Sequence, residues 1–272
     1  MHSISLIATD LDGTLLYDRG RITPRDRAML TRVREAGIPL VFATGRDLRL
    51  ILPVLDRLKL WDEVRYIIHT GGSGLYDVKT RTDRCLAELS PETLRDIYAK
   101  YASLPLSFLL TQDDIMHTNR MTDILRRESA LLDCPIVEEP DFSAILTRPN
   151  GKLVTCGEIE DLESALPILT ADPDPRYEFH RSHDNYIDCY VRGIGKGTAL
   201  TTLCEMLSIP VSETLAIGDN LNDLQILETA GYSACPGDGH PGIFSVVDYI
   251  ACPALEGAVA DVCEHFLFEK DN

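Results

Sequence analysis

Two features that are missing from this chain narrow what it can be. The eight cysteines are spread singly and none forms a C-x-x-C pair, so buried free thiols are expected rather than zinc ligands or disulfides. No apolar run approaches the roughly 20 residues that a membrane-spanning helix needs, and the apolar start lacks the basic flank of a signal peptide. From these absences we expect a cytoplasmic protein with no membrane partner.

Positive charge is also scarce. The chain has 26 Lys and Arg against 43 Asp and Glu, which gives a formal net charge of −17. Nucleic acids and anionic membranes are bound through clustered Lys and Arg, so the composition argues against both as partners. A small anionic substrate is compatible with this charge if a metal or a few placed cations supply local positive charge.

The 272 residues, of which 44% are hydrophobic, suit one large or two modest domains. Strand and helix patterns alternate at the start of the chain and again near its end, which predicts an α/β fold with parallel strands joined by right-handed crossovers. Between these parts the hydrophobic pattern of the sequence changes to that of short amphipathic strands and helices. We therefore predict a core formed by residues 1–78 and 186–272, with an α+β domain inserted at 79–185 and the core pattern resuming at 186–191.

The apolar residues 4–9 predict a buried strand that ends in Asp10, Leu11, Asp12, Gly13 and Thr14. Side chains alternate along a strand, so Asp10 and Asp12 would return to the same side and could address one ligand. Ligands of open α/β sheets bind at the carboxyl ends of the strands, which is where this turn would lie. The alternative is an Asx-type turn that merely joins a strand to a loop.

Two later strand or loop ends carry groups suited to a phosphate. The predicted strand 38–43 runs into Thr44, Gly45 and Arg46, and the Thr44 hydroxyl could hold a phosphate oxygen; an ordinary helix start is the alternative. Lys196 stands between glycines at the mouth of a predicted helix, where a phosphate could approach the backbone and the helix start. The alternative for Lys196 is a solvated surface charge.

The predicted strand 214–217 ends in Gly218, Asp219, Asn220, Leu221, Asn222 and Asp223. If a helix begins near Asn220, the four-residue spacing places Asp219 and Asp223 on one face at the strand edge. The alternative is that this segment merely caps a helix. Capping accounts for one acidic residue, but it does not account for two acidic residues close to Asp10 and Asp12.

Four carboxylates at one sheet edge would repel each other, because each close pair costs about 4 kcal/mol at an effective dielectric constant of about 20. A divalent cation removes that penalty, and ligands that are all oxygen favour magnesium. Magnesium, a lysine and a threonine hydroxyl make a cradle for a phosphoryl group that a carboxylate could attack in line. Phosphoryl transfer through an aspartyl phosphate, with a second carboxylate as general acid and base, fits this set best.

The ordered signatures resemble those of the haloacid dehalogenase superfamily of phosphotransferases. The large insert is similar to that of its Cof-type subgroup, in which an α/β cap covers a Rossmann-like parallel sheet core. The resemblance implies that Asp10 is the nucleophile and Asp12 the general acid and base. It further implies two sets of ligands. Contacts to the transferring phosphate would come from Thr44, Gly45, Lys196 and Asn222. Magnesium ligation would involve Asp10, Asp12 through its carbonyl, Asp219, and Asp223 as support.

The resemblance also bears on substrate and function. Arg46 would reach the substrate or the cap, and cap residues would select the leaving group, with His180, Arg181, His183 and Asp184 as candidates or as plain surface turn residues. We expect a magnesium-dependent phosphatase of small phosphorylated metabolites, such as sugar phosphates, that is a monomer or a weak homo-oligomer. The alternatives are a phosphohexomutase on the same capped fold and a catalytically silent binding or regulatory module.

Overall fold

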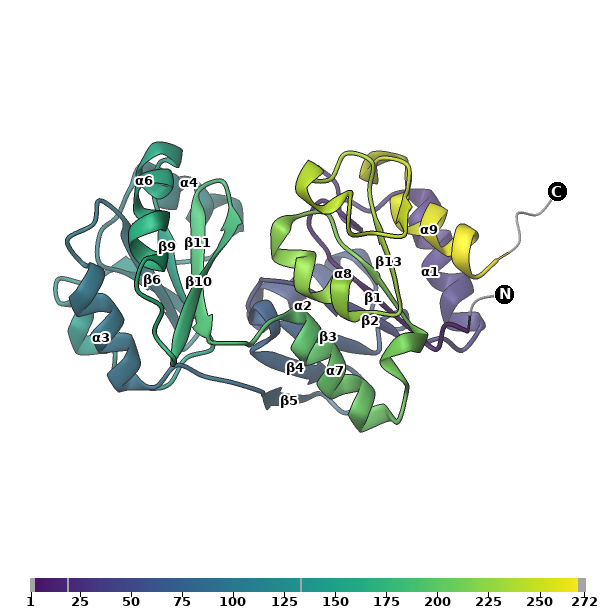
Figure 1. Ribbon diagram of the computed structural model, residues 1–272, viewed down its shortest axis with the longest axis horizontal. Coiled ribbons are helices and arrows are strands. Elements are labelled where there is room, and N and C mark those ends of the chain that lie inside the picture. Colours follow the sequence, from purple (N-terminus) through teal and green to yellow (C-terminus); the bar gives the residue numbers. More distant parts are fainter. Residues whose placement is uncertain (1–2, 19, 133, 269–272) are drawn as a thin grey trace. The chain divides into compact units, whose positions relative to one another are not determined.

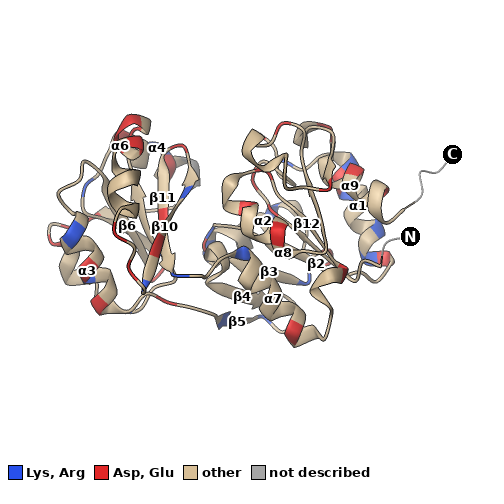
Figure 2. Cartoon of the chain, in the orientation of Figure 1, with Lys and Arg blue, Asp and Glu red and all other residues tan. Residues whose placement is uncertain are grey.

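The computed structural model describes residues 3–18, 20–132 and 134–268, and it divides into two compact units (Figure 1). Unit 1 comprises Met1–Leu86 and Ile194–Asn272, and unit 2 comprises Ala87–Gly193. Lys and Arg lie on several elements and are interspersed with Asp and Glu (Figure 2).

Unit 1 is built on an eight-stranded sheet with the order β14-β13-β12-β1-β2-β3-β4-β5. The strands from β14 to β3 are parallel, whereas β4 and β5 are antiparallel additions at one edge. The strand bounds are β1 Leu6–Thr9, β2 Leu40–Ala43, β3 Tyr66–His69, β4 Gly74–Asp77, β5 Thr82–Cys85, β12 Thr214–Ile217, β13 Tyr232–Cys235 and β14 Tyr249–Ile250. This parallel sheet confirms the predicted α/β class.

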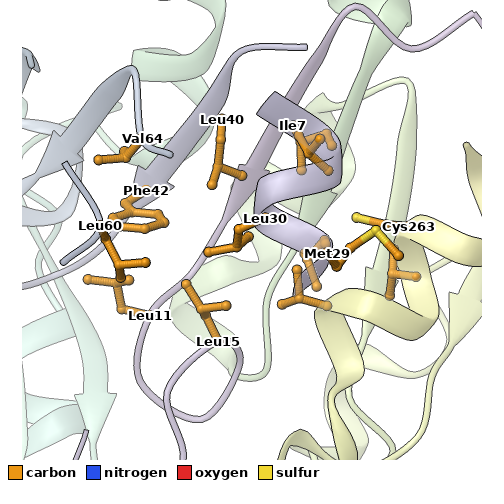
Figure 3. Packing of buried hydrophobic residues seen from close by; sticks show 14 of the residues in the cluster. Ile7, Leu11, Leu15, Met29, Leu30, Leu40, Phe42, Leu60, Val64 and Cys263 are labelled. Carbon is orange, nitrogen blue, oxygen red and sulfur yellow. The ribbon is translucent and has the colours of Figure 1, made fainter. Parts of the chain in front are cut away.

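Helices cover both faces of this sheet, which is why its central strands are apolar throughout rather than alternating. One face packs on α1 (Pro24–Glu35), α2 (Leu48–Leu58) and α9 (Ala258–Phe266), and the other on α7 (Lys196–Leu207) and α8 (Leu224–Thr229). Figure 3 shows the first of these cores, with Ile7 of β1 and Phe42 of β2 near Leu30 of α1. Short 3-10 turns complete the unit: η1 Thr70–Gly72, η2 Val211–Glu213, η3 Leu221–Asp223, η4 Pro241–Ile243 and η5 Ala254–Glu256.

Unit 2 contains a six-stranded sheet with the order β10-β11-β9-β6-β7-β8. Its strands are β6 Ser107–Gln112, β7 Ile115–Thr118, β8 Ile136–Glu138, β9 Leu153–Cys156, β10 Tyr177–His183 and β11 Tyr186–Val191. One face packs on α3 (Pro91–Tyr101), α5 (Phe142–Ile145) and α6 (Ile159–Thr170), and part of the other face on α4 (Asp123–Leu132). Unit 2 is thus an α+β unit with its own core.

The boundaries predicted at 78/79 and 185/186 are wrong, because both true boundaries lie further along the chain. Strand β5 pairs with β4 and so belongs to the sheet of unit 1. Strand β11 pairs with β10 and β9, so residues 186–191 end unit 2 instead of resuming the core. The apolar pattern of a strand does not identify the sheet that it joins, which explains both errors.

No disulfide joins the cysteines in the described part of the chain. Cys85 is exposed and Cys252 partly exposed, while the remaining thiols are buried as expected. Among the described residues, none of the helices has both the length and the apolar character required to cross a bilayer.

Candidate active site

The site is assembled at the carboxyl edge of the parallel sheet in unit 1. Strand β1 pairs with both neighbours so that Thr9 lies opposite Phe42 of β2 and Ile217 of β12. The Asp10 N–H continues this ladder by donating to the Ile217 carbonyl at 2.8 Å. The residues that follow each strand therefore emerge at one edge, which is where the signatures predicted them.

Lys196 joins two buried carboxylates. Its Nζ lies 2.6 Å from Oδ1 of Asp10 and 2.5 Å from Oδ1 of Asp223. The three residues Asp10, Lys196 and Asp223 are 7%, 2% and 1% exposed. Lys196 is therefore no solvated surface charge, and the predicted meeting of this lysine with the acidic residues is present in the structure.

Asp219 completes a cluster of three acids. Asp10, Asp219 and Asp223 each offer an oxygen within 4.8 Å of the others. Burial raises the pKa of Asp10 well above its usual value, although Lys196 opposes the rise. Burial, followed by the charge of Asp223, raises the pKa of Asp219 to about 7. Burial alone would lower the pKa of Lys196, but the charges of Asp10 and Asp223 outweigh it and raise that pKa.

Asp223 reaches the cluster by a route that differs from the predicted one. The chain after Asp219 forms the 3-10 turn η3 before α8 begins at Leu224, so no α-helix starts near Asn220. Oδ2 of Asp223 folds back and accepts the N–H groups of Asp219 and Asn220 at 3.0 and 3.2 Å. Both carboxylate oxygens of Asp223 thus already have donors.

The donor set fits magnesium, with Asp10 and Asp219 as the residues able to ligate it. Oδ1 of Asp10 is held by Lys196, and Oδ1 of Asp219 accepts the Thr14 hydroxyl at 3.0 Å. Within the described part of the chain, the second oxygen of each carboxylate receives no hydrogen bond. Two carboxylate oxygens suit a hard cation that keeps several of its waters. The oxygens of Asp223 are taken by Lys196 and two N–H groups, so Asp223 would support such a site rather than ligate the ion directly.

The Asp12 side chain lies outside this cluster. It is about half exposed, and its two oxygens accept Nε and Nη2 of Arg46 at 2.6 Å each. The Asp12 carboxylate is therefore not one of the three clustered acids, and its action on the same ligand as Asp10 stays a prediction. The Arg46 guanidinium is engaged by Asp12, and its contact with substrate or cap also stays a prediction.

The residues predicted to contact phosphate differ in their surroundings. Oγ1 of Thr44 accepts the Arg46 N–H at 3.2 Å, and no described residue takes the hydroxyl hydrogen. A Cβ added at Gly45 would meet no atom within 4 Å, so the space beside this residue is open. Oδ1 of Asn222 is buried without a hydrogen-bond partner among the described residues. Each of these observations is compatible with a phosphate ligand.

The start of α7 is not available to a phosphate in the way that the sequence suggested. Oε1 of Gln225 accepts the N–H groups of Gly197 and Thr198 at 3.0 and 3.4 Å. Gly195 is packed so closely that an added Cβ would lie 2.1 Å from the same oxygen. Lys196 can therefore act only through its ammonium group. No sequence signal indicated Gln225, since a lone glutamine in a helix is usually a surface residue.

The four residues suggested for leaving-group selection lie in or beside the β10–β11 hairpin. Nε2 of His180 is 3.3 Å from Oε1 of Glu178, and Arg181 donates to the carbonyls of His183 and Asp184. These contacts are local to the hairpin, so they give no support for a substrate role over the role of turn residues.

Comparisons with known proteins agree with this geometry. The sequence model of the haloacid dehalogenase-like hydrolases matches residues 7–263. The 5-amino-6-(5-phospho-D-ribitylamino)uracil phosphatase YcsE of Bacillus subtilis is 24% identical over 97% of this chain and 96% of its own. The HMP-PP phosphatase of Serratia proteamaculans is 26% identical over 96% of this chain and 95% of its own.

A solved haloacid dehalogenase-like hydrolase from Bacteroides thetaiotaomicron superposes with a TM-score of 0.84 and 27% identity, covering 97% of this chain and 100% of that one. The match extends over both units, so the predicted capped architecture is confirmed together with the predicted superfamily and Cof-type subgroup. The chain belongs to the haloacid dehalogenase-like hydrolase family.

Proposed function

We propose that this hydrolase is a magnesium-dependent phosphatase that cleaves small phosphomonoesters through an aspartyl phosphate on Asp10. One observation carries the proposal. A buried lysine holds Asp10 and Asp223 beside Asp219 at the edge of a parallel sheet. Burying several charged groups together costs free energy of folding. Such a cluster therefore indicates a functional site.

Asp10 is suited to act as the nucleophile. Lys196 fixes one oxygen of its carboxylate, which leaves the other to attack phosphorus. When bound to Asp10, Asp219 and the Asp12 carbonyl, magnesium would neutralise the carboxylates and the charge of the phosphoryl oxygens. The Thr44 hydroxyl, the Gly45 backbone, the Lys196 ammonium and the Asn222 side chain would hold the phosphoryl group during transfer.

Asp12 is suited to act as the general acid and base. Its half-exposed carboxyl can reach both a departing alcohol and a solvent water. It would donate a proton to the oxygen that leaves phosphorus, and it would later take a proton from the water that attacks the aspartyl phosphate. Arg46 contacts both oxygens of Asp12 and so fixes the plane of the carboxyl group between these steps.

Sugar phosphates or related metabolites are the proposed substrate class. Two relatives are named as phosphatases of small phosphorylated compounds, one of them a phosphoribityl derivative. A net charge of −17 leaves the buried Lys196 and a bound cation as local attractors for a phosphate.

The test is a phosphate-release screen over sugar phosphates, nucleotides and cofactor phosphates, with magnesium and with chelator. We expect release that requires magnesium, that is lost in Asp10→Asn, and that persists in Asp113→Asn, a matched change at an exposed carboxylate of unit 2. Equal release by Asp10→Asn would overturn the nucleophile assignment. An isomerised phosphate from a sugar 1-phosphate would favour a mutase, and binding without turnover would favour a silent module.

A further inference from the structure

The turn that follows β3 has an unusual backbone. Thr70, Gly71 and Gly72 have consecutive positive φ values of 50°, 64° and 108°. The left-handed region is accessible to glycine but is disfavoured for a β-branched residue such as threonine. Thr70 keeps this conformation only if its surroundings impose it, and such strain is concentrated at functional sites.

This turn holds the loop that carries Thr44. The Thr70 N–H donates to the Arg46 carbonyl at 2.8 Å, and the Gly71 N–H donates to the Thr44 carbonyl at 3.1 Å. The Thr70 hydroxyl donates to Oδ1 of Asp47 at 3.2 Å. The turn therefore anchors this loop at three points.

The same turn also supports the start of α7. A Cβ added at Gly72 would lie 2.2 Å from the carbonyl oxygen of Gly195, so the two backbones are in direct contact. Gly195 immediately precedes Lys196. One strained turn thus connects the two segments that would grip a phosphoryl group.

His69 holds the turn in place. Its ring is buried, with Nδ1 3.0 Å from Oγ1 of Thr70 and Nε2 2.9 Å from Oδ1 of Asp83 on β5. Gly74 of β4 lies against the ring, since a Cβ there would be 2.1 Å from Cε1. The result is a hydrogen-bonded chain that runs from Asp83 through His69 and Thr70 to Asp47.

The hydrogens that each group carries limit which hydrogen bonds can form along this chain. Both carboxylates only accept when ionised, so Nε2 of His69 donates to Asp83. The Thr70 hydroxyl has one hydrogen. If it donates this hydrogen to Asp47, the contact with His69 is a hydrogen bond only when Nδ1 carries a hydrogen. When Nδ1 carries no hydrogen, it accepts the hydroxyl hydrogen instead, so the ring can form a hydrogen bond with Thr70 in either arrangement.

We propose that His69 is a positioning residue for phosphate binding, acting through its hydrogen bond with Thr70, which keeps the turn and the Thr44 loop in place. The inference rests on the proposed function, because it takes Thr44 and Lys196 to be phosphate ligands. A loop displaced by a fraction of an ångström would weaken every contact to the phosphoryl group.

Two substitutions of His69 distinguish the effect of its hydrogen bonds from the effect of its ring volume. His69→Phe keeps the ring volume over Gly74 but removes both hydrogen bonds. His69→Asn places a side-chain amide near the position of Nδ1 and so restores a hydrogen bond with Thr70, but it gives up the one with Asp83. We expect His69→Phe to lower kcat/KM by about 10- to 100-fold and to weaken binding of inorganic phosphate in parallel, and His69→Asn to recover most of both.

The control is His117→Phe, because His117 is also a strand histidine paired with a carboxylate, at 2.7 Å from Glu139 in unit 2. It should leave phosphate binding unchanged. Fluorescence of Trp61, the single tryptophan and a residue of unit 1, verifies that each variant is folded.

The outcomes are distinct. Unchanged phosphate affinity in His69→Phe, or equal impairment of the Phe and Asn variants, would overturn the role of His69. Calorimetric binding of inorganic phosphate requires no turnover. If the wild type binds phosphate, if this binding is weakened in His69→Phe, and if the wild type hydrolyses no ester, the proposed function is contradicted and this inference still stands.

Discussion

Replacing Lys196 by methionine should destabilise unit 1 strongly. The change keeps most of the side-chain volume but removes the ammonium group that lies 2.6 and 2.5 Å from Asp10 and Asp223. Both carboxylates are more than nine-tenths buried, so their charges would be left without a nearby cation. Removing one partner of a buried ion pair typically costs about 3–5 kcal/mol, and we expect a loss in this range in metal-free protein at pH 8.

The loss should shrink as the pH is lowered. The pKa of Asp10 is already raised in the wild type by burial, and it must rise further without Lys196. The folded variant then binds more protons than its unfolded chain, so its stability relative to the wild type increases as pH falls toward 5. Added magnesium should restore part of the lost stability, because it supplies the missing positive charge.

The assay is urea unfolding in chelator, followed by the fluorescence of Trp61. This tryptophan packs against the core of unit 1, so its signal reports the unit that contains Lys196. Lys79→Met, an exposed lysine of the same unit, is the matched control and should unfold like the wild type. A loss below about 1 kcal/mol at pH 8, or a loss that grows as pH falls, would refute the electrostatic account of the site.

Two further predictions concern the metal and the start of α7. Because burial raises the pKa of Asp219 to about 7 and also raises that of Asp10, magnesium must displace protons below pH 7, and its affinity should fall by at least about tenfold per pH unit; calorimetry that finds constant affinity from pH 5 to 7 would contradict this. Gln225→Ala removes the acceptor of two N–H groups of α7 and should cost about 1–2 kcal/mol in urea unfolding, so an unchanged midpoint would show that this cap does not stabilise the helix.

Much of the site could be predicted because its residues follow buried strands. Asp10, Thr44 and Asp219 each come directly after an apolar strand, or one residue beyond it, and parallel strands bring such positions to one edge. The acidic residues near Asp223 indicated a metal site at this edge, and the glycines around Lys196 indicated a phosphate site. The residues that the structure gathers are accordingly those of the sequence signatures.

The errors arise where partners are distant in the sequence. Nothing local indicates that Arg46 pairs with Asp12, and the side chain of Asp12 turns out of the cluster as a result. Gln225 belongs to the neighbouring helix α8, and its side chain caps the start of α7. Strand β11 joins a sheet that its own apolar pattern cannot identify. His69 lies within an ordinary strand pattern, and its role depends on Asp83 and on the backbone of Thr70.

The central claim is that Asp10 becomes phosphorylated during turnover. The most direct measurement is a rapid acid quench of the wild type with radiolabelled phosphoester and magnesium, followed by mass spectrometry of the labelled peptide. The account predicts one phosphoryl group on Asp10 in the wild type, with the label appearing before free phosphate, and none in Asp10→Asn. Phosphate release at full rate with no labelled protein at any time, or a label on a residue other than Asp10, would contradict it.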